Sequence, residues 1–196
     1  MKLLRLSGLL VLAATVLMAC GGIASAAAPT SPAGTTYEGK FDAASEGHVV
    51  IANSIANIEC SSTLEGEVKF PGGNEPISVP LTSLTFTCTN SWAPTVSSPG
   101  SLEVHAIPGS QNGTVTWSGT KISFSRFGIS CNYKTEATDV GTLTGSKATG
   151  ATATIDLSGK LIIDSGGSFL CGSNTAAFSG SYKVGAPDYL DIDAEL

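Results

Sequence analysis

The sequence predicts an all-β protein, with an antiparallel two-sheet β-sandwich as the favoured architecture and a flattened β-barrel as the alternative. Three observations predict this class. Apolar and polar residues alternate with a period of two along many short segments, which is typical of half-buried strands. Turn signals separate these segments, and the 196 residues include 23 Gly and 9 Pro. No segment of useful length with a helical period follows the N-terminal region.

The alternating segments divide into inward and outward residues. In the first clear strand, 58–68, the inner face carries Ile58, Cys60, Leu64 and Val68, and the outer face carries Glu59, Glu65 and Glu67. In 82–88, the inner face carries Leu84, Phe86 and Cys88, and the outer face carries Ser83, Thr85 and Thr87. Further strands are expected over 36–42, 47–52, 101–106, 113–118, 120–126, 127–133, 140–145, 151–157, 176–184 and 190–196.

Short Gly- and Pro-containing pairs mark the expected turns between these strands. Asn112-Gly113, between two alternating runs, is the strongest single hairpin signal. Pro99-Gly100, Ser118-Gly119 and Ser158-Gly159 are also expected to be turns.

The N-terminal region has the pattern of an export signal. Lys2 and Arg5 precede an apolar run over 9–19, and Ala24-Ser25-Ala26 is a cleavage site with small residues. The run is shorter than the roughly 20 apolar residues that a membrane-spanning helix needs. The expected division of the chain is an export signal over 1–28, a short linker over 29–36 and a single β domain over 37–196.

Cys20 leaves two outcomes open for the leader. Leu17-Met18-Ala19-Cys20 is similar to a lipobox, in which the cysteine is lipidated and becomes the N-terminus. Cys20 is therefore the candidate lipidation site, and the chain is then a membrane-anchored lipoprotein. Cleavage further along the chain instead discards Cys20 and releases an extracellular or cell-envelope protein.

The four remaining cysteines are predicted to form two buried disulfides. They fall on the apolar side of their own strands, and thiols of exported chains are usually oxidised. The spacing favours pairing in sequence order, although four cysteines allow three connectivities. Neither a C-x-x-C pair nor a nearby His gives the ligand spacing of a metal site, so no metal is expected. The predicted disulfide residues are Cys60, Cys88, Cys131 and Cys171.

The charge of the chain disfavours several partners. The sequence has 10 Lys and Arg against 16 Asp and Glu, and two of the basic residues belong to the leader. An acidic chain without a basic cluster is poorly suited to nucleic acid or to anionic membrane surfaces. We therefore expect no nucleic-acid partner and no membrane insertion by the mature domain.

The sequence contains few candidate catalytic or ligand-binding groups. No nucleotide, hydrolase or zinc motif occurs, so neither a cofactor nor a catalytic residue is predicted. His48 and His105 are expected to be ordinary strand residues. Trp92, in the loop after Cys88, is the candidate binding residue, with a role in capping the core as the alternative.

Two groups of carboxylates could serve glycoside hydrolysis if they faced one another across a cleft. Solvated outer strand faces are the simpler explanation, because the acids of each group follow a strand alternation. The second group also lacks the spacing of a calcium loop. The groups are Glu59, Glu65 and Glu67, and Asp188, Asp191 and Asp193.

Five segments carry a resemblance to known proteins: 29–35, 45–68, 81–92, 126–135 and 139–145. They resemble a group of small exported actinobacterial proteins to which no function is assigned. The resemblance covers nearly all of the expected mature chain. It implies export, one β-rich domain and a leader that ends near Ala28, and it transfers no catalytic residue.

These observations favour a non-enzymatic exported protein that binds a protein partner, a glycan or the cell surface. One alternative is a carboxylate-dependent glycan hydrolase of the cell envelope. The other is a structural surface protein.

Overall fold

The computed structural model describes residues 28–30, 37–54, 56–69, 76–89, 93–126, 128–146, 151–164, 171, 174–187 and 191–193. Strands dominate this part of the chain, and it contains no α-helix. The predicted antiparallel all-β fold with two intradomain disulfides is confirmed. Residues 1–27, which are nearly all of the export signal expected over 1–28 and include Cys20, lie outside the described residues.

The strands follow the chain in a simple order. They are β1 (Ala28–Thr30), β2 (Gly39–Ser45), β3 (Val49–Ala52), β4 (Asn57–Val68), β5 (Ile77–Cys88), β6 (Thr95–Ser98), β7 (Ser101–Ala106), β8 (Gly113–Ser118), β9 (Lys121–Arg126), β10 (Ile129–Lys134), β11 (Thr138–Thr144), β12 (Thr154–Ile163), β13 (Thr175–Ala186) and β14 (Asp191–Asp193).

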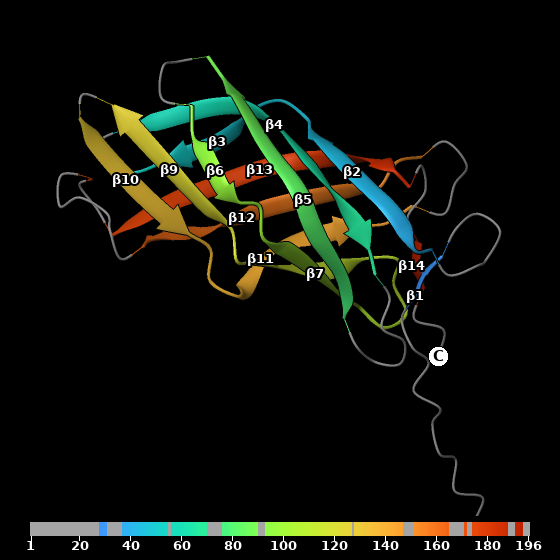
Figure 1. Cartoon of the computed structure of the whole chain (residues 1–196). Coiled ribbons are helices and arrows are strands. Elements are labelled where there is room, and N and C mark those ends of the chain that lie inside the picture. Colours follow the sequence, from blue (N-terminus) through green and yellow to red (C-terminus); the bar gives the residue numbers. More distant parts are fainter. Residues whose placement is uncertain are drawn as a thin grey trace, which may run out of the picture.

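Twelve of these strands belong to one continuous sheet whose pairings close into a circuit. β2 and β3 lie end to end along β4, and both also pair with β13. The circuit continues through β5, β7, β8, β11 and β12, and the pairing of β12 with β13 completes it. Figure 1 shows the result as two layers, with β4, β5 and β6 in front of β12 and β13.

β6 leads into β7, β8 into β9 and β10 into β11, and each of these pairs is one long strand with a bend. β6, β9 and β10 pair with one another beyond the bends, as β7, β8 and β11 do before them. The three bends lie side by side across the sheet, and hydrogen bonds join them in a row. The Thr120 hydroxyl donates to the Pro99 carbonyl at 2.6 Å, and the Thr120 amide donates to the Thr135 hydroxyl at 3.0 Å. Gly100 and Gly119 lie in this row with φ of 77° and 71°. The expected turns at Pro99-Gly100 and Ser118-Gly119 are therefore bends inside long strands.

Two other turn predictions need correction. Ser158-Gly159 is no turn, because Gly159 lies inside β12 opposite Phe178, and a Cβ there would lie 2.7 Å from a Val140 methyl. Glycine at this position permits close packing and not a chain reversal. The hairpin predicted at Asn112-Gly113 exists between β7 and β8, but its loop spans 107–112 and Gly113 is the first residue of β8.

β1 and β14 form a separate two-stranded pair. Pro29 and Thr30, the first residues of the expected linker, are therefore part of a strand. The rest of that linker lies outside the described residues.

The core lies between the two layers, where contacts join strands that are not neighbours in the sheet. The rings of Trp117 on β8 and Phe178 on β13 meet edge to face at 4.9 Å. The Tyr182 hydroxyl on β13 donates to the Ser62 hydroxyl on β4 at 3.1 Å, inside the core. The alternation predicted for 58–68 is confirmed, because its inward residues are all buried.

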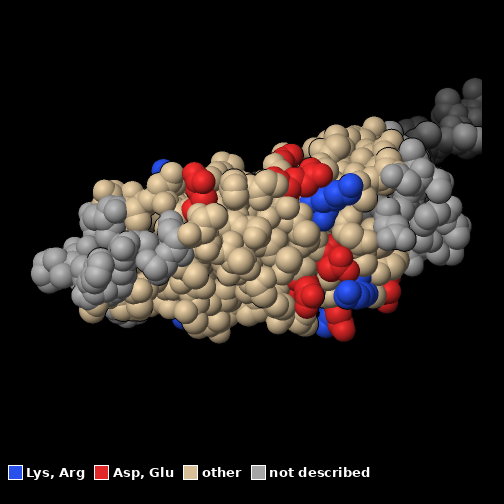
Figure 2. Space-filling view, turned by 90° about the horizontal axis from the view of Figure 1, so that it is seen from above, with Lys and Arg blue, Asp and Glu red and all other residues tan. Residues whose placement is uncertain are grey.

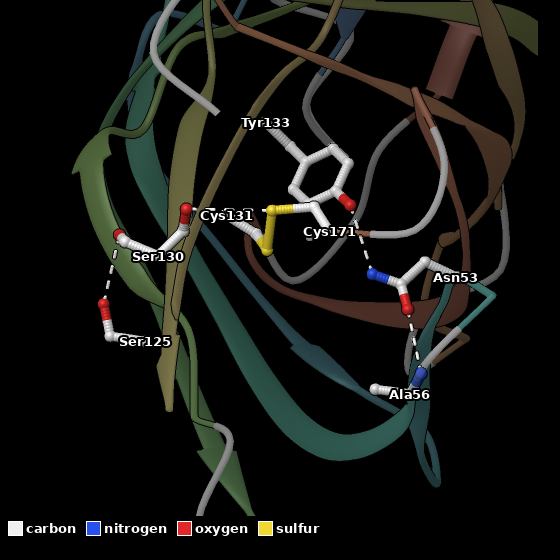
Figure 3. The surroundings of a disulfide bond; sticks show 7 residues. All are labelled: Asn53, Ala56, Ser125, Ser130, Cys131, Tyr133 and Cys171. Atoms are coloured by element: carbon white, nitrogen blue, oxygen red, sulfur yellow. Dashed lines mark hydrogen bonds between the residues drawn. A yellow bond between two sulfur atoms is a disulfide. The ribbon is translucent and has the colours of Figure 1, made fainter. Parts of the chain in front are cut away.

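The two disulfides join the predicted cysteines in sequence order. Cys60 and Cys88 are directly opposite each other on β4 and β5. Cys131 on β10 is joined to Cys171, which lies between β12 and β13. Figure 3 shows Tyr133 and Asn53 in the surroundings of this second bond, where the Asn53 amide donates to the Tyr133 hydroxyl at 3.1 Å. Disulfides of this kind indicate an oxidising environment.

The buried Tyr182 should make the protein less stable at alkaline pH. Burial raises the pKa of Tyr182 to about 12, although the hydrogen bond with Ser62 opposes part of the shift. In the unfolded chain the Tyr182 hydroxyl has a pKa near 10. The contribution of the neutral Tyr182 side chain to the free energy of unfolding is therefore complete below pH 10 and is lost as the pH rises to 12. The loss amounts to about 2–3 kcal/mol.

Urea unfolding between pH 8 and pH 11.5 measures this loss, with Tyr182→Phe as the matched variant. We expect the free energy of unfolding of the wild type to fall more steeply above pH 10 than that of the variant. Parallel pH profiles of the two proteins would contradict the assignment.

Candidate functional site

The outer surface of β4 and β5 carries a set of hydroxyl groups in two facing rows. The alternation of each strand points these side chains away from the core, and the register places Ser61 opposite Thr87 and Thr63 opposite Thr85. The Thr63 and Thr85 hydroxyls are 2.6 Å apart, and the Ser61 hydroxyl donates to the Thr87 carbonyl at 3.3 Å. We call this surface the hydroxyl face, formed by Ser61, Thr63, Thr85 and Thr87; Ser83 lies beyond it, opposite Glu65.

The backbone beneath the hydroxyl face is held firmly. The Cys60–Cys88 disulfide links β4 and β5 one position before the Ser61–Thr87 pair. Leu64 and Leu84, also opposite each other, are buried under the rows. Because the ladder, the disulfide and the core fix both strands, the spacing of the hydroxyls is set before any partner binds.

Charged groups border the hydroxyl face and do not enter it. Glu59 precedes the rows on β4, and Glu65 and Glu67 follow them, all exposed. Lys40 on β2 lies opposite Glu67 and forms an ion pair with Asp42 at 3.0 Å. The hydrogen bond and the charge of Asp42 raise the pKa of Lys40. Figure 2 shows that charges on the visible face gather in a few places and leave broad uncharged areas.

The carboxylates considered for hydrolysis do not form a catalytic arrangement within the described chain. Glu59, Glu65 and Glu67 share one outward strand face and do not face one another across a groove. Asp188 lies outside the described residues, and for Asp191 and Asp193 only the strand is described.

Other predicted site residues are dispersed. His48 and His105 are exposed. His105 lies on β7, as expected, but His48 lies in the short connection between β2 and β3 and not in a strand. Trp92 and Cys20, the candidates for binding and lipidation, lie outside the described residues. Within the part of the chain that the structure describes, no group of three or more His, Cys, Asp or Glu side chains could hold a metal ion.

The core also contains a small apolar cavity of about 20 Å³. A cavity needs roughly 10–15 Å³ to hold one water, and that water needs polar partners. This cavity has no polar lining, so it is neither a water site nor large enough for an organic ligand. Its walls are Phe41, Val68, Ile77, Val79, Leu102, Val104, Leu143 and Ile155.

The sequence predicted outward hydroxyls on the segment 82–88, but it did not indicate the facing row on β4. Joining them requires the register between β4 and β5, which alternation within one strand does not provide. The cysteines carried the missing signal. Once Cys60 and Cys88 are placed opposite each other, Ser61 must face Thr87 and Thr63 must face Thr85.

Comparisons with known proteins found no matching family model, no similar curated protein and no similar solved structure. Among the residues that the structure describes, no helix is long and apolar enough to span a bilayer.

Proposed function

We propose that the chain works outside the cytoplasm, in the cell envelope or the medium, as a non-catalytic module that binds a neutral glycan through the hydroxyl face. The observation that carries the proposal is the uncharged double row of hydroxyls on β4 and β5. The disulfides support a location outside the cytoplasm, because cytoplasmic thiols are kept reduced.

The chemistry of the face suits a polyol. Ser and Thr hydroxyls both donate and accept hydrogen bonds, as sugar hydroxyls do. No charged group within the rows has to lose its hydration when a neutral partner binds. The carboxylates at both ends of the rows, Glu59 and Glu65, disfavour anionic polymers by charge repulsion.

Binding to a neutral insoluble polysaccharide, such as cellulose or chitin, tests the proposal. Thr85→Lys places a long charged side chain in the middle of the hydroxyl face, and Thr142→Lys makes the same change at an exposed threonine of β11. We expect wild type and Thr142→Lys to bind equally and Thr85→Lys to bind about tenfold more weakly, equivalent to ~1.4 kcal/mol.

Two results would contradict the proposal. One is wild-type protein that remains wholly in solution with every neutral polysaccharide tested. The other is equal binding by the two lysine variants, provided that both have the circular dichroism spectrum of the wild type.

A further inference from the structure

Three neighbouring strands carry basic residues and no acidic ones. β9 pairs with both β6 and β10, in the half of the molecule away from β1 and β14 (Figure 1). The three strands contain Lys121, Arg126 and Lys134 and no Asp or Glu, and for Arg126 only the strand is described. The next acid along the chain, Glu136, follows the end of β10. In a chain with 16 Asp and Glu against 10 Lys and Arg, this part of the sheet is locally basic.

The outward side chains of these strands combine lysines with hydroxyls. The register places Lys121 opposite Lys134 and Ser125 opposite Ser130. The Ser125 hydroxyl donates to the Ser130 hydroxyl at 3.2 Å, and Figure 3 shows this pair on the side away from the Tyr133 ring. We call this surface the basic face, and its exposed or half-buried members are Thr95, Lys121, Ser123, Ser125, Ser130 and Lys134.

The two lysines of the basic face share one carboxylate. Their Nζ atoms lie 3.3 Å and 3.4 Å from the two oxygens of Asp164, which follows β12. Two ammonium groups against one carboxylate leave an excess of one positive charge. The lysine side chains are still 54% and 39% exposed, and each ammonium group has three donors. A carboxylate from solution can therefore reach both groups beside Asp164.

This chemistry suits a polymer that carries carboxylates as well as hydroxyls. Lysine ammonium groups bind carboxylates, and Ser and Thr hydroxyls exchange hydrogen bonds with sugar hydroxyls. The positive charge attracts an anionic partner to this face, while the acids elsewhere on the chain repel it. The face has no aromatic member on which the bases of a single-stranded nucleic acid could stack. Its two lysines are also fewer than the roughly 4–8 basic residues that bind an anionic membrane.

We propose that the basic face binds an acidic polysaccharide. The Lys121–Lys134 pair holds a uronate carboxylate, and the hydroxyls along β6, β9 and β10 bind the hydroxyls of the neighbouring sugars. From Lys121 to Ser125 the face extends about 13 Å along β9, so a short run of sugars contacts it. The basic face and the hydroxyl face lie on different strands, and the inference does not depend on the proposed binding of neutral glycans.

Equilibrium binding to polygalacturonate on beads tests the inference, at ~20 mM NaCl, where screening is weak. Lys121→Gln/Lys134→Gln removes both positive charges and keeps long polar side chains. Lys160→Gln/Lys183→Gln is the matched control, because it makes the same change in net charge at exposed lysines of β12 and β13. We expect the first variant to bind about tenfold more weakly than the wild type and the control to bind within twofold of it.

Methyl-esterified polygalacturonate has the same sugar backbone without the negative charges. We expect the wild type and Lys121→Gln/Lys134→Gln to bind this ester equally, because the lysines act through the carboxylates. Duplex DNA is the third probe, and we expect no binding of the wild type at the concentrations that saturate polygalacturonate.

Four results would overturn the inference. The first is a wild type that does not bind polygalacturonate, and the second is an equal loss of binding in the two double variants. The third is a loss of ester binding in Lys121→Gln/Lys134→Gln as large as its loss of polygalacturonate binding. The fourth is DNA binding as tight as that of polygalacturonate. None of these results depends on whether cellulose or chitin binds, so this inference and the proposed function can fail separately.

Discussion

Replacement of Gly100 by alanine should lower the free energy of unfolding by about 4 kcal/mol, through backbone strain together with overpacking. Gly100 has a φ of 77°, a conformation that L side chains rarely adopt. An added Cβ would also lie 2.2 Å from the Ser118 carbonyl oxygen and 2.4 Å from the Thr120 hydroxyl. Because these atoms lie at the next bend, the neighbouring strand cannot move away without breaking the hydrogen bonds of Thr120 with Pro99 and Thr135.

Gly109→Ala is the matched control for this substitution. Gly109 has a φ of 72°, but nothing lies within 4 Å of a Cβ there. Its cost is therefore the backbone strain alone, about 1–2 kcal/mol. Urea unfolding of both variants separates the two contributions. Equal losses of stability in Gly100→Ala and Gly109→Ala would show that the row of bends is not tightly packed.

Removal of the disulfides should have the second large effect. The bonds close sequence separations of 28 and 40 residues, and the loss of chain entropy gives each a contribution of roughly 3.5–4 kcal/mol. Cys60→Ala/Cys88→Ala and Cys131→Ala/Cys171→Ala should therefore each unfold at lower urea concentration. The variant without either bond should lack a stable fold, since single domains have a total stability of about 5–15 kcal/mol.

Urea unfolding monitored by tryptophan fluorescence measures all three variants. The two bonds join different segments, β4 to β5 and β10 to the segment before β13, so we expect their effects to add. An unchanged unfolding midpoint in the protein without disulfides would show that the sheet alone determines stability.

The sequence predicted strands best where alternation was uninterrupted. The expected segments 101–106 and 113–118 coincide with β7 and β8. β5 begins at Ile77, five residues before the first residue of its expected segment, because Pro80 conceals the early part of the strand. β12 continues to Ile163 through Gly159, which looked like a turn. Gly159 is accommodated by close packing against Val140, whereas Pro80 lies beside a register shift between β4 and β5.

The closure of the sheet could not be predicted in the same way. Alternation reports which side of a strand is buried, but the pairing of β12 with β13 and of β13 with β2 and β3 depends on contacts distant in sequence. The cysteines were the exception, since their inward positions and spacing predicted the observed pairing. The hydroxyl face depended on register and was therefore visible only in the structure.

The most direct test of the account is disulfide mapping of the protein, purified without reductant, by mass spectrometry of non-reduced peptides. The account predicts two bonds, Cys60–Cys88 and Cys131–Cys171, with none of these four thiols free. These bonds fix β4 against β5 beneath the hydroxyl face and β10 against the segment before β13. A bond from Cys60 to Cys131 or Cys171 would contradict the register of the sheet, and four free thiols would contradict folding in an oxidising compartment.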